Sequence, residues 1–190
     1  MGSGAKMSCF QKGNINSDLE SEIINLIELH QEGEYWDFKR QWYDSSKVVD
    51  LLHDIICMAN NLANHDAYII IDVDDENFSL YDVAADRNRR NTQKIVDFLK
   101  DKKFVGDIRP IVTVKQVLIK SFILDVIIIH NSRQTPFYLK EKFQSLKANH
   151  IYTRIQDSNT PKDKSADIDK VDGKKDLVLF KRQMKNLKFI

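Results

Sequence analysis

Residues 32–39 read EGEYWDFK, and the order of residue types in this stretch decides the expected fold. Large aromatic side chains stand at Trp36 and Phe38, while charged side chains stand at Asp37 and Lys39. Successive side chains of a β-strand point to opposite faces, so the alternation predicts a strand with one buried aromatic face. The other face then carries a carboxylate and an ammonium group two positions apart, with their heads able to converge.

The segments on either side of this strand predict a sheet covered by helices. Ser17 and Glu20 fit a capping box, and isoleucines at helical spacing predict a helix over about 18–31. Downstream, a broad apolar stripe over 46–59 predicts a second helix that packs on a sheet. The continuous apolar run AYIIIDV, residues 67–73, predicts a central strand covered on both faces.

The second half of the chain is rich in β-branched residues. A short helix is expected over 92–102, and the runs at 111–117 and 122–132 predict two strands joined as a hairpin or meander. Weaker strand patterns follow at 135–141 and 150–155. The fold class that we predict is therefore α/β or α+β, with a mixed β-sheet flanked by helices.

The chain ends in the pattern of an amphipathic helix, with apolar residues at three- and four-residue steps over 174–190. Its basic side chains could touch phosphates, although a solvated helix face explains them more simply. We divide the chain into residues 1–16, a tag remnant and N-terminal arm, residues 17–162, the domain, and residues 163–190, a C-terminal helical extension.

Length and composition limit the class of protein. The 190 residues suit one domain, and 29 basic against 28 acidic residues give a formal net charge of +1, so any surface for nucleic acid must be a local patch. Two cysteines are too few for a disulfide framework and favour a reducing compartment. Without a signal peptide pattern or a long apolar run, we expect a cytoplasmic protein with no membrane partner.

Carboxylates at neighbouring strand ends suggest a hydrolytic site. Glu32 precedes the glycine that leads into the first strand, and Asp74 follows the second strand. Adjacent strands lie about 5 Å apart, so Glu32, Asp37 and Asp74 could share a divalent cation such as Mg²⁺ or Mn²⁺. Lys39 could then hold a phosphate or the attacking water. The simpler alternative is that these acids are solvated or pair with a neighbouring lysine.

Several arginines are candidates for contact with phosphate. Arg87, Arg89 and Arg90 follow one another closely, with Lys94 nearby, and arginine forks bind phosphate bidentately. A solvated loop explains the same cluster. Arg154 could clamp a phosphate or pair with an acid of the second strand. No phosphate-binding glycine motif is present, so we expect no nucleotide cofactor, and no histidine pair has zinc-ligand spacing.

Four sequence elements, taken in order, resemble the Schlafen AlbA-2 domain family: EGEYWDFK, then IICMANN, then AYIIIDVDDE, and finally HIYTRIQDSNTP. The resemblance covers residues 17–162. It implies a Schlafen AlbA-2-like fold. In family members that are ribonucleases it also implies three carboxylates that act with a divalent metal on structured RNA such as transfer RNA. By motif position these acids fall on Glu32, Asp37 and Asp74, and the family's lysine falls on Lys39.

The chain departs from the family pattern at three positions. Asp37 stands where glutamate is common, which shortens the reach to a cation by one methylene. Asp72 and Gln156 each stand where the family has glycine. A glycine would allow a backbone or ligand to approach closely, so the side chain at Asp72 could either add a ligand or spoil the site.

The resemblance leaves two main functions open, and a third that is weaker. The first is a metal-dependent endoribonuclease that prefers RNA to DNA and forms a homodimer, since the Schlafen ribonuclease core pairs two such lobes. The second is a non-catalytic DNA- or RNA-binding module that retains the fold. A protein-interaction domain is the third.

Overall fold

The computed structural model describes residues 11–166, so the predicted C-terminal helix lies outside the described residues. The α-helices are α1 (Gln11–Glu28), α2 (Val48–Ala59) and α3 (Thr92–Lys100), and the short 3-10 helices are η1 (Ser45–Lys47), η2 (Val83–Ala85) and η3 (Val105–Asp107). The strands are β1 (Trp36–Lys39), β2 (Ala67–Ile71), β3 (Val112–Ile119), β4 (Phe122–Ile129), β5 (Arg154–Ile155) and β6 (Ser158–Asn159).

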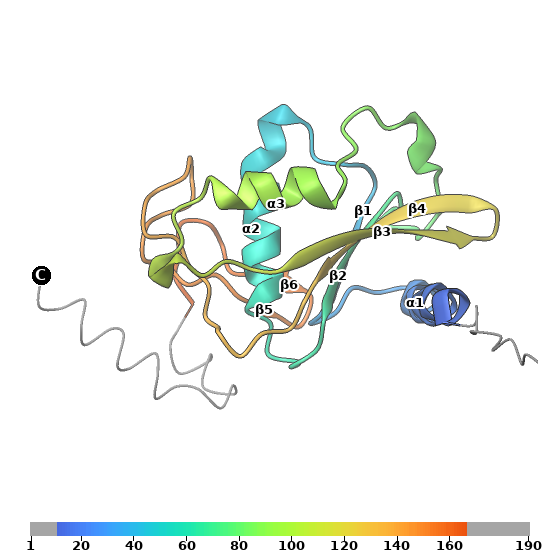
Figure 1. The fold of residues 1–190 in the computed structure, drawn as a ribbon, viewed down its shortest axis with the longest axis horizontal. Helices are drawn as coiled ribbons and strands as arrows, with labels where there is room; N and C mark the ends of the chain where they lie inside the picture. The colour runs from blue at the N-terminus through green and yellow to red at the C-terminus, as the bar shows by residue number, and fades with distance from the viewer. Residues whose placement is uncertain (1–10, 167–190) are drawn as a thin grey trace, which may run out of the picture.

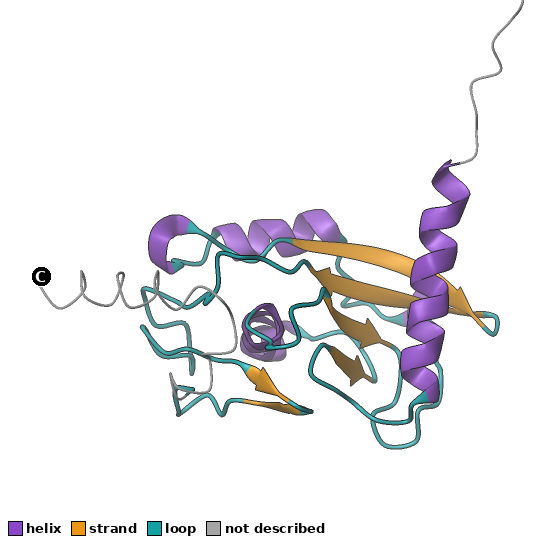
Figure 2. Ribbon diagram, turned by 90° about the horizontal axis from the view of Figure 1, so that it is seen from below, coloured by secondary structure: helices purple, strands orange, loops and turns teal. Residues whose placement is uncertain are grey.

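The main sheet is mixed, as the sequence predicts. Its order is β1-β2-β4-β3, in which β1 and β2 run parallel while β2–β4 and β4–β3 are antiparallel. β5 and β6 form a separate two-stranded hairpin. The α1 helix covers one face of the sheet, and α2 and α3 lie on the other (Figures 1 and 2).

The alternation in EGEYWDFK sets which side chains meet which helix. Trp36 and Phe38 pack with Ile23 of α1 in one apolar cluster. Asp37 and Lys39 therefore point to the face that α2 covers. This confirms the predicted orientation of β1 and brings its two charged side chains to the helix that follows it in the chain.

Three local predictions differ from the structure. The first helix begins at Gln11, so Ser17 lies inside it and is not its N-cap. The segment 135–141 makes one isolated bridge at Leu139 but forms no extended strand, and the 150–155 pattern yields only two strand residues. Whether the last two segments form strands depends on pairing with a neighbouring strand, which residue propensity alone does not predict.

Asn60 at the end of α2 holds the irregular segments in place. Its side-chain nitrogen donates to the carbonyls of Phe137 and Tyr152 at 2.8 Å each, and its side-chain oxygen accepts from the Phe137 amide at 2.8 Å. Thr153 Oγ1 donates to the Asn60 carbonyl at 2.7 Å. These buried bonds fix the chain directly before Arg154, and so they position β5 beside the sheet.

Both residues that replace a glycine of the family pattern, Asp72 and Gln156, have a left-handed backbone conformation. Asp72 has φ of 68° and Gln156 has φ of 57°. Glycine adopts this region without the clash that a Cβ brings, which accounts for its use at both places. Gln156 is the first residue of the two-residue loop between β5 and β6, where glycine is often favoured.

This conformation leads to a testable difference between neighbouring residues. We expect Gln156→Gly to raise the free energy of unfolding by about 0.5 kcal/mol, because relief of left-handed strain exceeds the added freedom of the unfolded chain. Asp157→Gly is the matched control, because Asp157 is also exposed but its φ is not positive, and it should lower stability by a similar amount. Urea unfolding would measure both, and equal losses in the two variants would contradict the argument.

Candidate functional site

Arg154 is the centre of the candidate site and is only 2% exposed. Its Nε donates to the Gly33 carbonyl at 2.7 Å, and Nη2 donates to Glu32 Oε2 at 2.9 Å. Nη1 donates to Asn159 Oδ1 at 3.1 Å, and Nη2 lies 3.4 Å from Asp37 Oδ1. The planar guanidinium thus joins the turn before β1, β1 itself and the β5–β6 hairpin.

Gly33 shapes the turn that brings Glu32 to Arg154. A Cβ at this position would lie 2.2 Å from the Trp36 ring, so a larger residue would push the ring and the turn apart. The Gly33 amide donates to the Trp36 carbonyl at 3.2 Å, and Trp36 Nε1 donates to the Gln31 carbonyl at 2.8 Å. The buried tryptophan therefore fixes the position of Glu32 as well as the core.

Glu32 and Asp37 form a close pair of carboxyl groups. Glu32 Oε1 accepts from the Phe38 amide at 3.0 Å. Burial, followed by the neighbouring Asp37 carboxylate, raises the pKa of Glu32 to about 7. Glu32 is therefore only partly ionised at neutral pH and can share a proton with Asp37.

Asp37 stays ionised because two cations and a hydrogen bond compensate its burial. Burial alone would raise the pKa of Asp37, but Lys39, the hydrogen bond from Glu32 and Arg154 hold it below its ordinary value. Lys39 Nζ lies 2.5 Å from Asp37 Oδ2. The lysine that we predicted to bind a phosphate is thus a counter-ion of the carboxylate that we predicted to bind a metal.

Asp54 is a buried acid of this site that the sequence did not single out. It lies on α2, accepts a 2.5 Å hydrogen bond from Tyr43 and a 2.8 Å bond from Asn159. Burial raises the pKa of Asp54 to about 6, against the lowering effect of Lys39. Its position directly before the IICMANN segment gave no signal, since an acid there fits a solvated helix face equally well.

We call Glu32, Asp37, Lys39, Asp54 and Arg154 the charged cluster. Asn159 bridges it, because its oxygen accepts from Arg154 and its nitrogen donates to Asp54. The cluster thus holds three acids and two bases, all wholly or partly buried. Buried charges of this kind persist where they are paired and hydrogen-bonded.

Two cavities are lined by members of the charged cluster. The first, of about 570 Å³, is lined by Lys39 and Asp54 and also by Arg40, Lys47 and Lys162, and we call it the Lys39 cavity. The second, of about 530 Å³, is lined by Glu32 and has no lysine or arginine in its wall. A phosphate is therefore better accommodated in the Lys39 cavity.

Asp74 does not join the other predicted metal ligands. Its Oδ1 accepts from the amides of Glu76 and Asn77 in its own turn, at 3.1 and 3.0 Å. The left-handed residue Asp72 ends the strand alternation before the chain reaches Asp74. Among residues 11–166, no group of three or more histidine, cysteine, aspartate or glutamate residues is arranged to hold a metal ion.

Glu32 and Asp37 can still be tested as a two-carboxylate site. Magnesium is commonly bound by one or two carboxylates, with waters and phosphate completing the octahedron. Oxygens of both acids face each other here, but Arg154 holds Glu32 and Lys39 holds Asp37. A divalent ion fits these residues only if Lys39, whose side chain is 31% exposed, leaves Asp37.

Asp72 is buried among charged residues outside the charged cluster. Burial, together with Asp86, raises its pKa to about 6, and one of its carboxylate oxygens has no hydrogen-bond partner. Arg40 and Arg89 offset part of this effect. The structure therefore gives no contact through which Asp72 could assist Glu32 or Asp37.

The predicted nucleic-acid contacts divide into three groups. Arg154 is buried, and it pairs with Glu32 and Asp37 instead of an acid of the second strand. Arg89 is held by both oxygens of Asp125, at 2.8 and 2.9 Å. Arg87 is exposed and Arg90 is half-buried, so these two are the arginines of the set whose charge is not committed to an acid.

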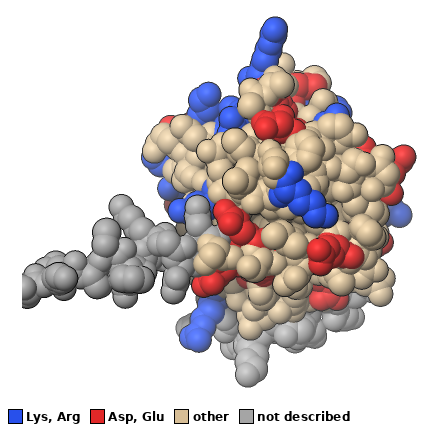
Figure 3. Space-filling view, turned by 90° about the vertical axis from the view of Figure 1, so that its right-hand side faces the viewer, with Lys and Arg blue, Asp and Glu red and all other residues tan. Residues whose placement is uncertain are grey.

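The surface does not carry one dominant charge. On the face drawn in Figure 3, basic and acidic side chains are interspersed, in keeping with the formal net charge of +1. Any contact with a polyanion would therefore use local groups of basic residues. Among residues 11–166, none of the helices has the length and apolar character that crossing a membrane requires.

The role of Arg154 as a structural cation can be measured. Arg154→Met should lower the free energy of unfolding by about 3 kcal/mol, because it leaves buried carboxyl groups without their partner. Adding Glu32→Gln should restore part of the loss, since the amide needs no counter-charge. Chemical denaturation of both variants tests this, with the exposed Arg133→Met as a control. An Arg154→Met variant as stable as the control would refute the assignment.

The raised pKa of Glu32 predicts a pH dependence of stability. The folded protein binds the proton of Glu32 up to a pKa of about 7, whereas the ordinary value is 4.5, so stability falls as pH rises through this window. Asp54 acts in the same direction. Because Glu32 is partly exposed, we expect Glu32→Gln to remove about 1 kcal/mol of the change between about pH 5 and about pH 8.

Urea titrations at several pH values would measure this effect. The exposed Glu141→Gln serves as control and should keep the pH profile of the wild type. An unchanged profile in Glu32→Gln would show that Glu32 ionises in the folded state as it does in the unfolded chain.

The chain was compared with known proteins and protein families. The chain is similar to a solved structure, the DIP2311 protein from Corynebacterium diphtheriae, with 16% sequence identity and a TM-score of 0.43 over 78% of this chain and 31% of that one. This chain thus spans about a third of that protein. No curated protein matches the chain. The family description "Schlafen, AlbA_2" matches residues 32–163, which include every member of the charged cluster. The chain therefore belongs to the Schlafen AlbA_2 family of nucleic-acid-related domains.

Proposed function

We propose that this domain binds structured RNA, such as transfer RNA, and cleaves its phosphodiester backbone at the Lys39 cavity. The observation that carries the proposal is the placement of Lys39, which is ion-paired with the buried carboxylate of Asp37, in the wall of a cavity lined by four lysine and arginine side chains. Catalysis of phosphodiester cleavage needs cations near the phosphate and a group that can exchange a proton.

The basic residues of the cavity would bind the phosphate. Lys39 and Lys47 are available for this, whereas Lys162 pairs with Asp50 and Arg40 stacks on the Tyr81 ring. When a phosphate oxygen approaches, the Lys39 ammonium can donate to it while still facing Asp37. Lys39 is thus the residue that would link the buried cluster to a substrate.

Asp54 is suited to the proton transfer. It lines the same cavity, and its pKa of about 6 leaves it mostly ionised near neutral pH while making it a stronger base than an ordinary aspartate. The hydrogen bonds from Tyr43 and Asn159 would hold its carboxylate in one orientation. During hydrolysis, Asp54 would accept a proton from the attacking water as the water oxygen bonds to phosphorus. The ester P–O bond would break, and the leaving oxygen would depart with the bonding electron pair and take a proton from solvent.

Mg²⁺ or Mn²⁺ remains part of the proposal, with Glu32 and Asp37 as the residues that would hold it. When bound, the ion would supply positive charge to polarise a phosphate oxygen. Arg154 would keep Glu32 in place, and Lys39 would have to turn from Asp37 toward the cavity. Asp74, the third acid of the family pattern, would contribute only after a rearrangement of its turn.

A non-catalytic binding module is the second candidate. The observation in its favour is that Arg154 and Lys39 already neutralise Glu32 and Asp37, while Asp74 caps its own turn. Such a cluster would serve to shape the domain, and the surface cations alone would contact RNA or DNA. We further propose a cytoplasmic homodimer, in which the second copy extends the binding surface.

One experiment separates the two candidates. The purified chain is incubated with transfer RNA and with duplex DNA, in Mn²⁺ or in EDTA, and products are resolved on a denaturing gel. We expect metal-dependent cleavage of the RNA that falls by about 100-fold in Asp37→Asn, because loss of one catalytic charge is costly. Asp74→Ala tests whether the third acid takes part, and the exposed Asp157→Asn is the control.

The outcomes differ clearly. Salt-sensitive binding of RNA or DNA without cleavage would support the binding module and end the proposal of an enzyme. Cleavage that persists in EDTA would refute the role of the metal. It would leave the proposed site standing if Asp37→Asn still abolishes the cleavage. No binding at low salt would refute both candidates. Sedimentation of the same samples would establish whether the chain is a dimer.

A further inference from the structure

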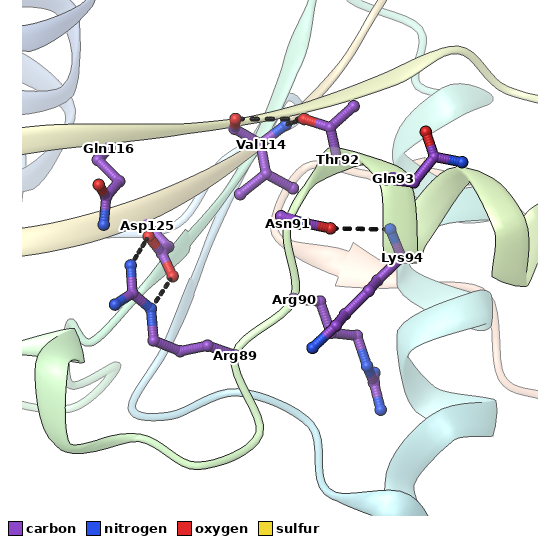
Figure 4. Close-up of a pocket in the computed structure, with 9 residues that line it drawn as sticks. All are labelled: Arg89, Arg90, Asn91, Thr92, Gln93, Lys94, Val114, Gln116 and Asp125. Atoms are coloured by element: carbon purple, nitrogen blue, oxygen red, sulfur yellow. Dashed lines mark hydrogen bonds and ion pairs between the residues drawn. The ribbon is translucent and has the colours of Figure 1, made fainter.

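A third cavity, separate from the charged cluster, lies between α3 and the β3–β4 hairpin. Its volume is about 590 Å³, and its wall includes Arg89, Arg90, Lys94 and Asp125 (Figure 4). Three basic residues and one acid leave this wall with a net charge of +2. We call it the Arg90 cavity.

The only acid in this wall is already neutralised. Both oxygens of Asp125 accept from Arg89, and one of them also accepts from Trp42 Nε1 at 2.9 Å. Arg89 is occupied in the same way, as the dashed lines of Figure 4 show. Asp125 therefore does not repel an incoming anion strongly, and Arg89 serves to hold the wall of the cavity.

Arg90 and Lys94 carry the charge that is left over. Neither side chain forms an ion pair within residues 11–166, and Nη1 of Arg90 is buried without a hydrogen-bond partner. Burial lowers the pKa of Arg90, because removing the charged guanidinium from water costs free energy and no acid beside it offsets that cost. A partly buried guanidinium without a counter-ion is stabilised by any anion that reaches it.

The neighbouring polar groups favour an oxyanion with several acceptor oxygens. Gln93 and Gln116 also line the cavity, and the Gln116 side chain offers an amide donor, whereas Gln93 Nε2 already donates to Asp97 at 2.8 Å. Asn91 already caps the first turn of α3 through the Lys94 amide at 3.0 Å, so the side chains, and not that amide, would bind the ligand. Guanidinium and ammonium donors around one space match a phosphate group.

The Arg90 cavity adjoins the Lys39 cavity. Trp42 lines the Lys39 cavity, Asp125 lines the Arg90 cavity, and the two side chains are hydrogen-bonded to each other. The two cavities are therefore neighbours, linked by this one hydrogen bond between a side chain of each wall. A strand of nucleic acid at Lys39 would pass close to Arg90.

We propose that the Arg90 cavity binds a phosphate group, and that it receives a second backbone phosphate of the strand bound at the Lys39 cavity. The identity of the strand rests on the proposed function, but the site itself does not. Its role is to fix the path of the strand across Trp42, which would place one phosphodiester bond beside Lys39 and Asp54.

The first arm of the test uses inorganic phosphate. Titration of ¹⁵N-labelled protein with sodium phosphate, against sodium chloride at equal ionic strength, should shift the Arg90 Nε–H and Gln93 amide signals. Arg90→Gln should weaken phosphate binding by about tenfold, because a charge-assisted hydrogen bond is lost. Arg90→Lys should retain part of the affinity, and the exposed Arg133→Gln should leave it unchanged. Phosphate binding that is equal in Arg90→Gln and wild type would overturn the site.

The second arm uses a labelled single-stranded oligoribonucleotide, with anisotropy measured over a range of salt concentrations. Arg90→Gln should reduce the slope of log affinity against log salt by about 0.7, the value for one phosphate contact on a single strand. Lys94→Gln, a change at an exposed side chain, gives the same test if Arg90→Gln fails to fold.

The two arms distinguish the sources of the phosphate. Phosphate binding that depends on Arg90, with an unchanged RNA salt slope, would establish a site for free phosphate and refute the second backbone contact. A chain that binds RNA through Arg90 but cuts none would uphold this site while the proposed cleavage fails.

Discussion

The buried guanidinium of Arg154 is the interaction on which the rest of the site depends. Its donors reach the Glu32 carboxyl group, the Gly33 carbonyl and the Asn159 side chain, which belong to segments more than a hundred residues apart. A lysine could supply the charge but not this set of directions. The guanidinium therefore both closes the fold and determines how close Glu32 comes to Asp37.

The charge balance around Arg154 explains the properties of the acids. Lys39 and Arg154 keep Asp37 ionised, whereas burial dominates at Glu32 and Asp54 and raises their pKa values to about 7 and about 6. Three carboxyl groups with two bases would leave one excess negative charge if all were ionised. Partial protonation of Glu32 and Asp54 removes that excess at neutral pH.

The sequence was sufficient to predict the parts that depend on local alternation and helical spacing. The strand at residues 36–39, its aromatic face, the two central helices and the β3–β4 hairpin all follow from such patterns. The meeting of Glu32, Asp37 and Lys39 follows too, because all three lie within eight residues. Asp74 could not be placed, since its orientation depends on the left-handed residue Asp72 two positions earlier.

Contacts across long sequence separations were not predictable in the same way. Asp54 joins the cluster through Asn159, which is 105 residues away, and Arg89 pairs with Asp125, which is 36 residues away. In neither pair does a sequence motif around one residue indicate which residue is its partner. The resemblance to the family placed Arg154 at an important position, but only the packing of β5 shows that it is a buried counter-ion and not a surface clamp.

Differences in freedom among the charged residues limit how the site can respond to a ligand. Arg154 is fixed by five acceptors, Asp37 is 1% exposed, and Asp54 is held by Tyr43 and Asn159. Lys39 is different, because its ammonium group contacts Asp37 and its side chain is partly exposed. A phosphate or a cation that enters the Lys39 cavity must therefore act first on this ammonium group. Movement of Lys39 would change the charge that Asp37 experiences, and through Asp37 the proton on Glu32, without any change in the backbone.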